Sequence, residues 1–223
     1  MPVANGGWIV SKTTPTLDGL YAQNRAAAIK ADQVGMDFVM SMGKFRGFGG
    51  ETDHWGTSLE SVTLMAAIAE ATKTVRIWAT VHPLLQNPAV AAKMVATLDH
   101  ISGGRAGLNI VAGAYKAEFD QMSAWDDSLS HDDRYAEGAD MGAILAMLAN
   151  WGVPADRLQA VARKQGAFMT ETIVGSPATC REQVEAFMTE CELDGLMLIF
   201  PDYVEGLAMF GGEILPALRS VFA

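Results

Sequence analysis

The chain has few cysteines and no cysteine motif of the kind that binds metal. Cys180 and Cys191 fall in one helical pattern of the 223-residue sequence. At ~1.5 Å rise per residue they lie roughly 16 Å apart, too far for a disulfide. No CxxC pair and no cluster of cysteine and histidine is present, so the sequence offers no structural zinc site. We therefore expect reduced, mostly buried thiols and no bound metal.

Long apolar runs and excess basic charge are also lacking. No run approaches the ~18 apolar residues of a membrane-spanning helix, and the N-terminus has no signal-peptide pattern. The net charge of −10 disfavours a nucleic-acid partner, because binding phosphates needs clustered lysine and arginine. We therefore expect a cytoplasmic protein with neither a membrane nor a nucleic acid as partner.

Short β-branched or aromatic runs alternate with longer helical segments, a rhythm typical of βαβ units and a parallel sheet. Strands are expected at residues 7–10, 36–42, 75–81, 106–112 and 195–200. The last of these is apolar at nearly every position, as in a strand covered on both faces.

Helix signals stand between these strands. A helix follows Pro15 and ends at Gly35, and another begins at a capping box formed by Thr57 and Glu60. A third runs from Pro88 to about His100. The apolar stripe of the second helix is Leu64, Ile68 and Ala71. Toward the C-terminus, Ser176 with Pro177 starts a helix, and the last helix carries the stripe Leu207, Phe210, Ile214 and Leu218.

Five strands leave two folds open. A closed (β/α)8 barrel needs eight strands and ~250 residues, whereas five parallel strands can form an open doubly wound sheet. The GxGxxG fingerprint of dinucleotide-binding sheets is absent after the first strand. Residues 138–166 read as helical and contain no strand, so the pattern alone does not choose between the folds.

Several segments resemble the luciferase-like flavin-dependent monooxygenases. They are residues 37–50 (DFVMSMGKFRGFGG), 59–66, 91–105, 109–113, 131–136 (HDDRYA) and 194–203. Within that superfamily the KFRGFGG loop is most similar to the pyrimidine monooxygenases that open the uracil ring. The resemblance implies a single α/β domain over 1–223, a TIM barrel. Its pattern breaks near 137–138, where strands five to seven are missing.

Reading the ends of the strands gives candidate site residues, because barrel enzymes place the active site at the carboxyl ends of their strands. Lys44 follows the second strand, and Thr80 with His82 ends the third. Asn109 interrupts the apolar fourth strand with an amide that needs hydrogen-bond partners. Asp202 and Tyr203 follow the last strand and shape the rim.

The resemblance implies roles for these positions. FMN would be bound by Gly43, Lys44, Asn109, Glu118, Arg134 and Tyr135. Thr80 would line the oxygen side of the flavin together with Asn109. His82 stands where relatives often carry a small residue, as an acid–base group, a substrate contact or a structural histidine. His54, Trp55 and Trp125 would lie at the substrate mouth.

The implied reaction uses FMNH2 from a separate NAD(P)H-dependent reductase. A flavin–oxygen adduct transfers one atom of O2 to a small organic substrate, either a pyrimidine-like heterocycle or an organosulfur compound. Gly113 is followed by Ala114, where the pyrimidine-specific relatives carry tryptophan. The alternatives are a deazaflavin-dependent oxidoreductase and a non-catalytic flavin-binding protein. Relatives form dimers or tetramers, so a homodimer or homotetramer is expected.

Overall fold

The computed structural model describes residues 18–47, 55–113, 115–128, 173–200 and 202–222. The chain divides into two compact units, residues 1–138 with 198–212, and residues 139–197 with 213–223. The first unit contains α1 (Tyr21–Gln33), β1 (Phe38–Met40), α2 (Ser61–Ala71), β2 (Arg76–Val81), α3 (Pro88–Ser102), β3 (Ala106–Ile110), α4 (Lys116–Asp120) and α9 (Tyr203–Met209). The second contains α8 (Pro177–Glu190) and α10 (Leu215–Phe222), and the π-helical turn η1 (Phe210–Ile214) links α9 to α10.

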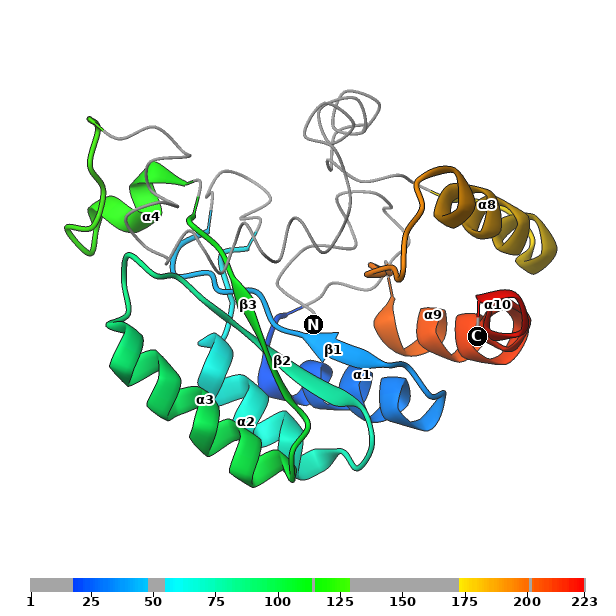
Figure 1. Cartoon of the computed structure of the whole chain (residues 1–223), viewed down its shortest axis with the longest axis horizontal. Helices are drawn as coiled ribbons and strands as arrows, with labels where there is room; N and C mark the ends of the chain where they lie inside the picture. The colour runs from blue at the N-terminus through cyan, green and yellow to red at the C-terminus, as the bar shows by residue number, and fades with distance from the viewer. Residues whose placement is uncertain (1–17, 48–54, 114, 129–172, 201, 223) are drawn as a thin grey trace. The chain divides into compact units, whose positions relative to one another are not determined.

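Three neighbouring strands form a parallel sheet in the order β1-β2-β3 (Figure 1). These are three of the expected strands, each somewhat shorter than the sequence predicts, and they confirm the α/β class. Thr80 lies opposite Asn109 across the β2–β3 pair. The strand expected at residues 7–10 and the helical stretch 138–166 lie outside the described residues.

The core lies between this sheet and α2 and α3, which run along one side of it (Figure 1). Ile77, Ala79 and Val81 point from β2 into the core, where Met65 and Ile68 of α2 are fully buried. Burying each large apolar side chain contributes about 1.5–3 kcal/mol. Because side chains alternate along a strand, Trp78, Thr80 and His82 are directed to the opposite face, away from these helices.

The expected capping box at Thr57 and Glu60 is wrong, although the helix is where the sequence predicts it. Glu60 is itself the N-cap, and its carboxylate accepts hydrogen bonds from the backbone N–H of Val62 (3.0 Å) and Thr63 (2.7 Å). A carboxylate here satisfies free amides at the positive end of the helix dipole. In the expected stripe, Leu64 and Ile68 are buried, while Ala71 is only half-buried.

The other expected helix ends agree more closely with the structure. α1 ends shortly before Gly35, which has the left-handed φ of +77°. α3 begins at Pro88 after the N-cap Asn87 and ends at Gly103, also left-handed. Ser176 caps α8 with Pro177 at its first position. The stripe Leu207, Phe210, Ile214 and Leu218 is buried.

The strand expected at residues 195–200 is wrong, because this segment forms no strand in the structure. Met197 and Ile199 are 59% and 67% exposed, so the segment is not covered on both faces. A strand needs a neighbour to take its backbone hydrogen bonds, and the sheet of the described residues consists of β1, β2 and β3 alone.

Both cysteines are free, as expected, but they are half-buried and not mostly buried. Within the described ranges, no helix is long and apolar enough to cross a membrane. The same part of the chain holds no group of three or more side chains suited to a metal ion.

Candidate functional site

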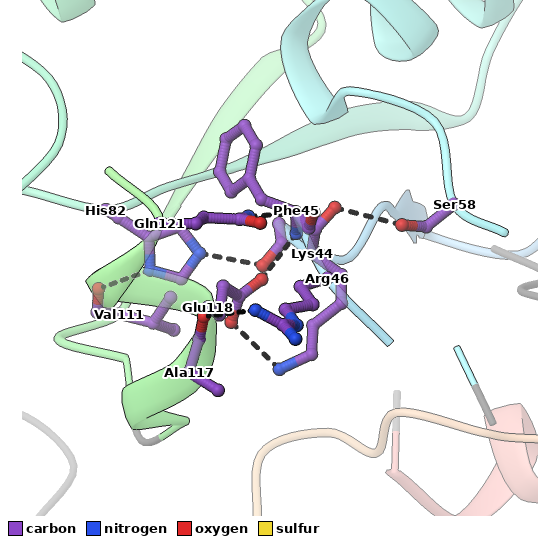
Figure 2. A network of polar contacts seen from close by, with 10 residues as sticks. Lys44, Phe45, Arg46, Ser58, His82, Val111, Ala117, Glu118 and Gln121 are labelled. Atoms are coloured by element: carbon purple, nitrogen blue, oxygen red, sulfur yellow. Dashed lines mark hydrogen bonds and ion pairs between the residues drawn. The ribbon is translucent and has the colours of Figure 1, made fainter. Parts of the chain in front are cut away.

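Most of the candidate site residues gather at the carboxyl edge of the sheet. Gly43 and Lys44 follow β1, His82 follows β2 and Asn109 lies near the end of β3. Because the three strands are parallel, these positions share one edge, which is where α/β proteins bind ligands. The short helix α4 follows β3 (Figure 1). Its Glu118 lies at the same edge, beside Lys44 (Figure 2).

The centre of this edge is a buried ion pair between Lys44 and Glu118 (Figure 2). Lys44 Nζ lies 2.9 Å from Glu118 Oε2, and the two side chains are only 10% and 2% exposed. The other carboxylate oxygen of Glu118 accepts a hydrogen bond from the backbone N–H of Phe45. Glu118 therefore holds both the side chain of Lys44 and the backbone that follows it.

Aromatic rings also contact the Lys44 ammonium. Its Nζ lies 5.1 Å from the ring centroid of Trp55 and 5.0 Å from that of Tyr115. Cations are attracted to ring faces at such distances. Trp55 adopts a φ of +61°, a conformation that is rare outside glycine. The ammonium is thus enclosed by one carboxylate and two aromatic rings.

His82 bridges the ends of two other strands. Its Nε2 lies 2.7 Å from the carbonyl oxygen of Gly43, and its Nδ1 lies 3.2 Å from that of Val111 (Figure 2). The residue is 4% exposed, and its ring packs edge-on against Phe119 with centroids 5.3 Å apart. Both ring nitrogens therefore contact backbone carbonyls.

Gly43 has no room for a side chain. A Cβ there would lie 2.9 Å from His82 Nε2 and 3.0 Å from Thr80 Cγ2. Contacts this short force the neighbours to move, so glycine at position 43 permits the close approach of His82. The next turn of the loop has a similar constraint, since a Cβ on Gly47 would lie 2.5 Å from the Cα of Gly56.

A second polar network joins Thr80 to Asn109. Asn109 Nδ2 donates to Thr80 Oγ1 at 3.0 Å, and the Thr80 hydroxyl donates to the carbonyl of Ser41. The backbone N–H of Thr80 donates to Ser61 Oγ at 2.7 Å, and the Ser41 and Ser61 hydroxyls contact each other. Ser61 begins α2, so this network anchors that helix to the strand ends.

A pocket of about 240 Å3 opens beside Lys44. It is lined by Lys44, Phe45, Arg46, Trp55, Gly56, Ser58 and Glu60. Ser58 donates from its hydroxyl to the carbonyl of Lys44 at 2.9 Å, and Arg46 donates to the carbonyl of Ala117 at 3.3 Å. The sequence prediction did not include Arg46 and Ser58, although Arg46 stands in the glycine-rich loop that carries Lys44.

The structure brings most of the expected site residues together. Gly43, Lys44, Glu118 and His82 meet in one network, and Thr80 and Asn109 meet in the other. Glu118 lies in the short helix α4. Arg134, Tyr135 and His54 lie outside the described residues.

The expected rim residues have local contacts of their own. Asp202 caps α9, accepting from the backbone N–H of Val204 and Glu205. Burial raises the pKa of the Tyr203 hydroxyl to about 12, which keeps the phenol neutral. Trp125 packs against Phe119, with ring centroids 6.1 Å apart.

The donor set at the carboxyl edge suits a flavin. The isoalloxazine ring presents carbonyl oxygens and ring nitrogens, and it gains negative charge on reduction. Lys44 offers an ammonium, Asn109 an amide and Gly43 a backbone without a side chain. A preorganised cation stabilises negative charge in a site shielded from water, so these residues fit FMN.

The chain belongs to the luciferase-like monooxygenase family, whose sequence model matches residues 2–157. The match covers all three strands of the sheet and the whole of the Lys44–Glu118 network. Residues 194–203, which also resemble this family, lie outside the matched range.

Pyrimidine monooxygenases are among its similar relatives. The RutA protein of Caulobacter sp. (strain K31) is 42% identical over 153 residues, which cover 69% of this chain and 43% of the relative. The RutA protein of Methylobacterium radiotolerans is 43% identical over 152 residues, covering 68% of this chain and 40% of the relative. The matched region thus spans less than half the length of these relatives.

Among solved structures, the EDTA monooxygenase EmoA of Chelativorans sp. BNC1 matches with a TM-score of 0.52 at 19% identity. The match covers 70% of this chain and 36% of EmoA. This likeness concerns the fold alone, and it agrees with the luciferase-like α/β class.

Proposed function

We propose that the chain acts as an FMNH2-dependent monooxygenase that inserts one atom of O2 into a small organic substrate. The proposal rests mainly on one observation. Two polar networks, Lys44–Glu118 and Thr80–Asn109, both lie at the carboxyl edge of the sheet. Membership of the luciferase-like monooxygenase family supports the same reaction class. The full fold would be the family's (β/α)8 barrel, acting as a homodimer or homotetramer.

In this proposal FMN is held by Gly43, Lys44, Asn109, Glu118, Arg134 and Tyr135. When bound and reduced, the flavin supplies the electrons that activate O2, and a separate NAD(P)H-dependent reductase delivers it. Lys44 contributes a positive charge to the site. Glu118 fixes the direction of that charge through its contacts to Lys44 Nζ and to the amide of Phe45.

Thr80 and Asn109 would form the part of the site that binds oxygen and substrate, and His82 follows the same strand as Thr80. The Thr80 hydroxyl directs its proton to the Ser41 carbonyl and accepts from the Asn109 amide, so its orientation is set from two sides. The polar atoms are therefore positioned before any ligand arrives. The reaction also needs shielding from water, and Thr80 and His82 are 5% and 4% exposed.

The first substrate to test is a pyrimidine such as uracil, because similar relatives are named pyrimidine monooxygenases. An organosulfur compound is the second. The purified chain is incubated with NADH, FMN, a flavin reductase and uracil under 18O2. We expect one 18O atom in the product. Consumption of uracil without 18O, or turnover that occurs equally without the chain, would contradict the proposal.

A further inference from the structure

The side chain of His82 lies between the ends of two strands and contacts the backbone of both. Its ring nitrogens reach the carbonyl of Gly43 after β1 and the carbonyl of Val111 after β3, while its own backbone follows β2. One side chain thus connects the carboxyl ends of all three described strands. Its backbone N–H is held as well, since it donates to Gln86 Oε1 at 3.1 Å.

The two contacts of the ring are unequal. A neutral imidazole has one N–H and can donate to only one carbonyl. The Nε2 contact to Gly43 is 2.7 Å and the Nδ1 contact to Val111 is 3.2 Å, so the shorter contact assigns the proton to Nε2. The single N–H of the neutral ring therefore donates to Gly43.

The carbonyl of Gly43 belongs to the same peptide group as the backbone N–H of Lys44. A donor on that carbonyl restrains the rotation of the peptide and hence the direction in which the Lys44 side chain leaves the loop. The missing Cβ of Gly43 leaves the space that Nε2 needs. Phe119 packs edge-on against the same ring, with centroids 5.3 Å apart.

We propose that His82 is a positioning residue, which orients Lys44 for the flavin by donating from Nε2 to the Gly43 carbonyl. The link to flavin rests on the proposed function, whereas the hydrogen bond itself does not. Proton transfer is not required of the ring in this role, and both of its nitrogens already face carbonyl oxygens.

The test compares His82→Gln, whose amide nitrogen can replace Nε2 as donor, with His82→Leu, which fills similar space without a donor. FMN titration should give a Kd about tenfold weaker for His82→Leu, the loss expected for one buried hydrogen bond. His82→Gln should stay within about threefold of the wild type. Equal Kd values for the two variants would overturn the proposal.

Nitrogen NMR provides a readout that needs no flavin, and its first part needs only the wild-type chain. We expect the His82 ring to carry its proton on Nε2. In His82→Gln the Lys44 amide nitrogen should keep its shift, whereas in His82→Leu it should move upfield. A proton found on Nδ1 would overturn the proposal. If the wild type bound no FMN while these signals appeared, the proposed function would fail and the positioning of Lys44 would stand.

Discussion

At the scale of single residues, the candidate site depends on a charge pair that is removed from water. Lys44 and Glu118 are each at least nine-tenths buried, and each has further contacts that compensate for lost hydration. Removing one partner of such a pair leaves the other as an uncompensated buried charge, which costs about 3–5 kcal/mol. The pair is therefore important for stability as well as for binding.

Replacing Glu118 by glutamine tests this pair. The glutamine amide would still accept from the Phe45 backbone N–H, but it would leave the Lys44 ammonium without its counter-charge. We expect the free energy of unfolding to fall by about 3 kcal/mol, measured by urea denaturation. The matched control is Lys116→Gln, which breaks two exposed pairs, with Asp120 and Asp127, and should leave the urea midpoint unchanged. Equal effects of the two substitutions would contradict the role of burial.

Replacing Thr80 by valine tests the second network. Valine keeps the shape of threonine but removes the hydroxyl that accepts from Asn109 and donates to Ser41. We expect kcat/KM for O2 to fall about tenfold, the effect of one lost hydrogen bond. Thr80→Ser keeps the hydroxyl and should stay within about threefold. A Thr80→Val chain with unchanged oxygen kinetics would remove Thr80 from the proposed site.

The sequence could indicate these residues but not their pairing. Lys44 and Glu118 stand 74 positions apart, and Thr80 and Asn109 stand 29 apart. Their positions near strand ends are visible in the pattern of apolar runs, and that predicts a shared edge. Which side chain meets which depends on the register, Thr80 opposite Asn109, and on the path of α4, which no local pattern encodes.

At the scale of elements, two polar side chains hold the strands and helices in place. Arg105 precedes β3 and donates from its guanidinium to the carbonyls of Ala69, Thr72, Val75 and Ser102 and to the hydroxyl of Thr72. The contacts to Ala69 and Thr72 satisfy free carbonyls at the end of α2, and the contact to Ser102 does the same at the end of α3. A cation there also interacts favourably with the helix dipole.

Replacing Arg105 by lysine should therefore destabilise the unit, although the charge is kept. Lysine is a point charge and lacks the planar fork of donors. We expect a loss of about 2–3 kcal/mol in the free energy of unfolding, measured by thermal and urea denaturation. Arg76→Lys at an exposed position at the start of β2 is the control and should change it little. An unchanged free energy of unfolding for Arg105→Lys would show that these hydrogen bonds contribute little.

Asp32 in α1 similarly holds the turn before β2. It accepts from the backbone N–H of Lys73, Thr74 and Val75 and from the Thr74 hydroxyl. Burial alone would raise the pKa of Asp32, but these hydrogen bonds to the carboxylate outweigh it and lower the pKa from 3.8 to about 2. The folded state therefore binds the proton less readily than the unfolded state.

The direction of the pH dependence follows from that pKa. The stabilisation is fully present above pH 3.8 and is lost as the pH falls through about 2. We expect Asp32→Asn to lower the free energy of unfolding by about 1 kcal/mol at pH 7, after allowance for solvent screening. The difference from the wild type should shrink toward pH 2 in urea titrations. A difference that stays constant from pH 7 to pH 2 would contradict this role.

Elements were predictable from sequence where their own residues determine them. The strands β2 and β3 and the helices α3 and α8 have strong local signals, such as Pro88 at the start of α3 and Ser176 with Pro177 at the start of α8. The segment 195–200 has an equally strong apolar signal, yet it forms no strand, because a strand also depends on the neighbour beside it. The predicted capping box was wrong because α2 begins at Ser61, with Glu60 and not Thr57 as its N-cap.

At the scale of the whole molecule, the chain matches less than half of the length of the pyrimidine monooxygenases to which it is similar. That match includes the strand ends that hold Lys44, Thr80 and Asn109. The family's fold could be predicted from the KFRGFGG loop and the strands around it. The number of strands in the complete fold could not be predicted, because residues 138–166 show no strand pattern in the sequence. The described sheet contains three strands.

An anaerobic titration of the purified chain with FMNH2 is the most direct test of whether the carboxyl edge of the sheet binds reduced flavin. It is followed by fluorescence and run beside Lys44→Met, with an intact mass of the same sample to compare with 23.8 kDa. We expect saturable binding by the wild type and a Kd for Lys44→Met that is weaker by about tenfold or more. No binding by a folded wild-type chain, or equal binding by both, would contradict the assignment of this edge as a flavin site.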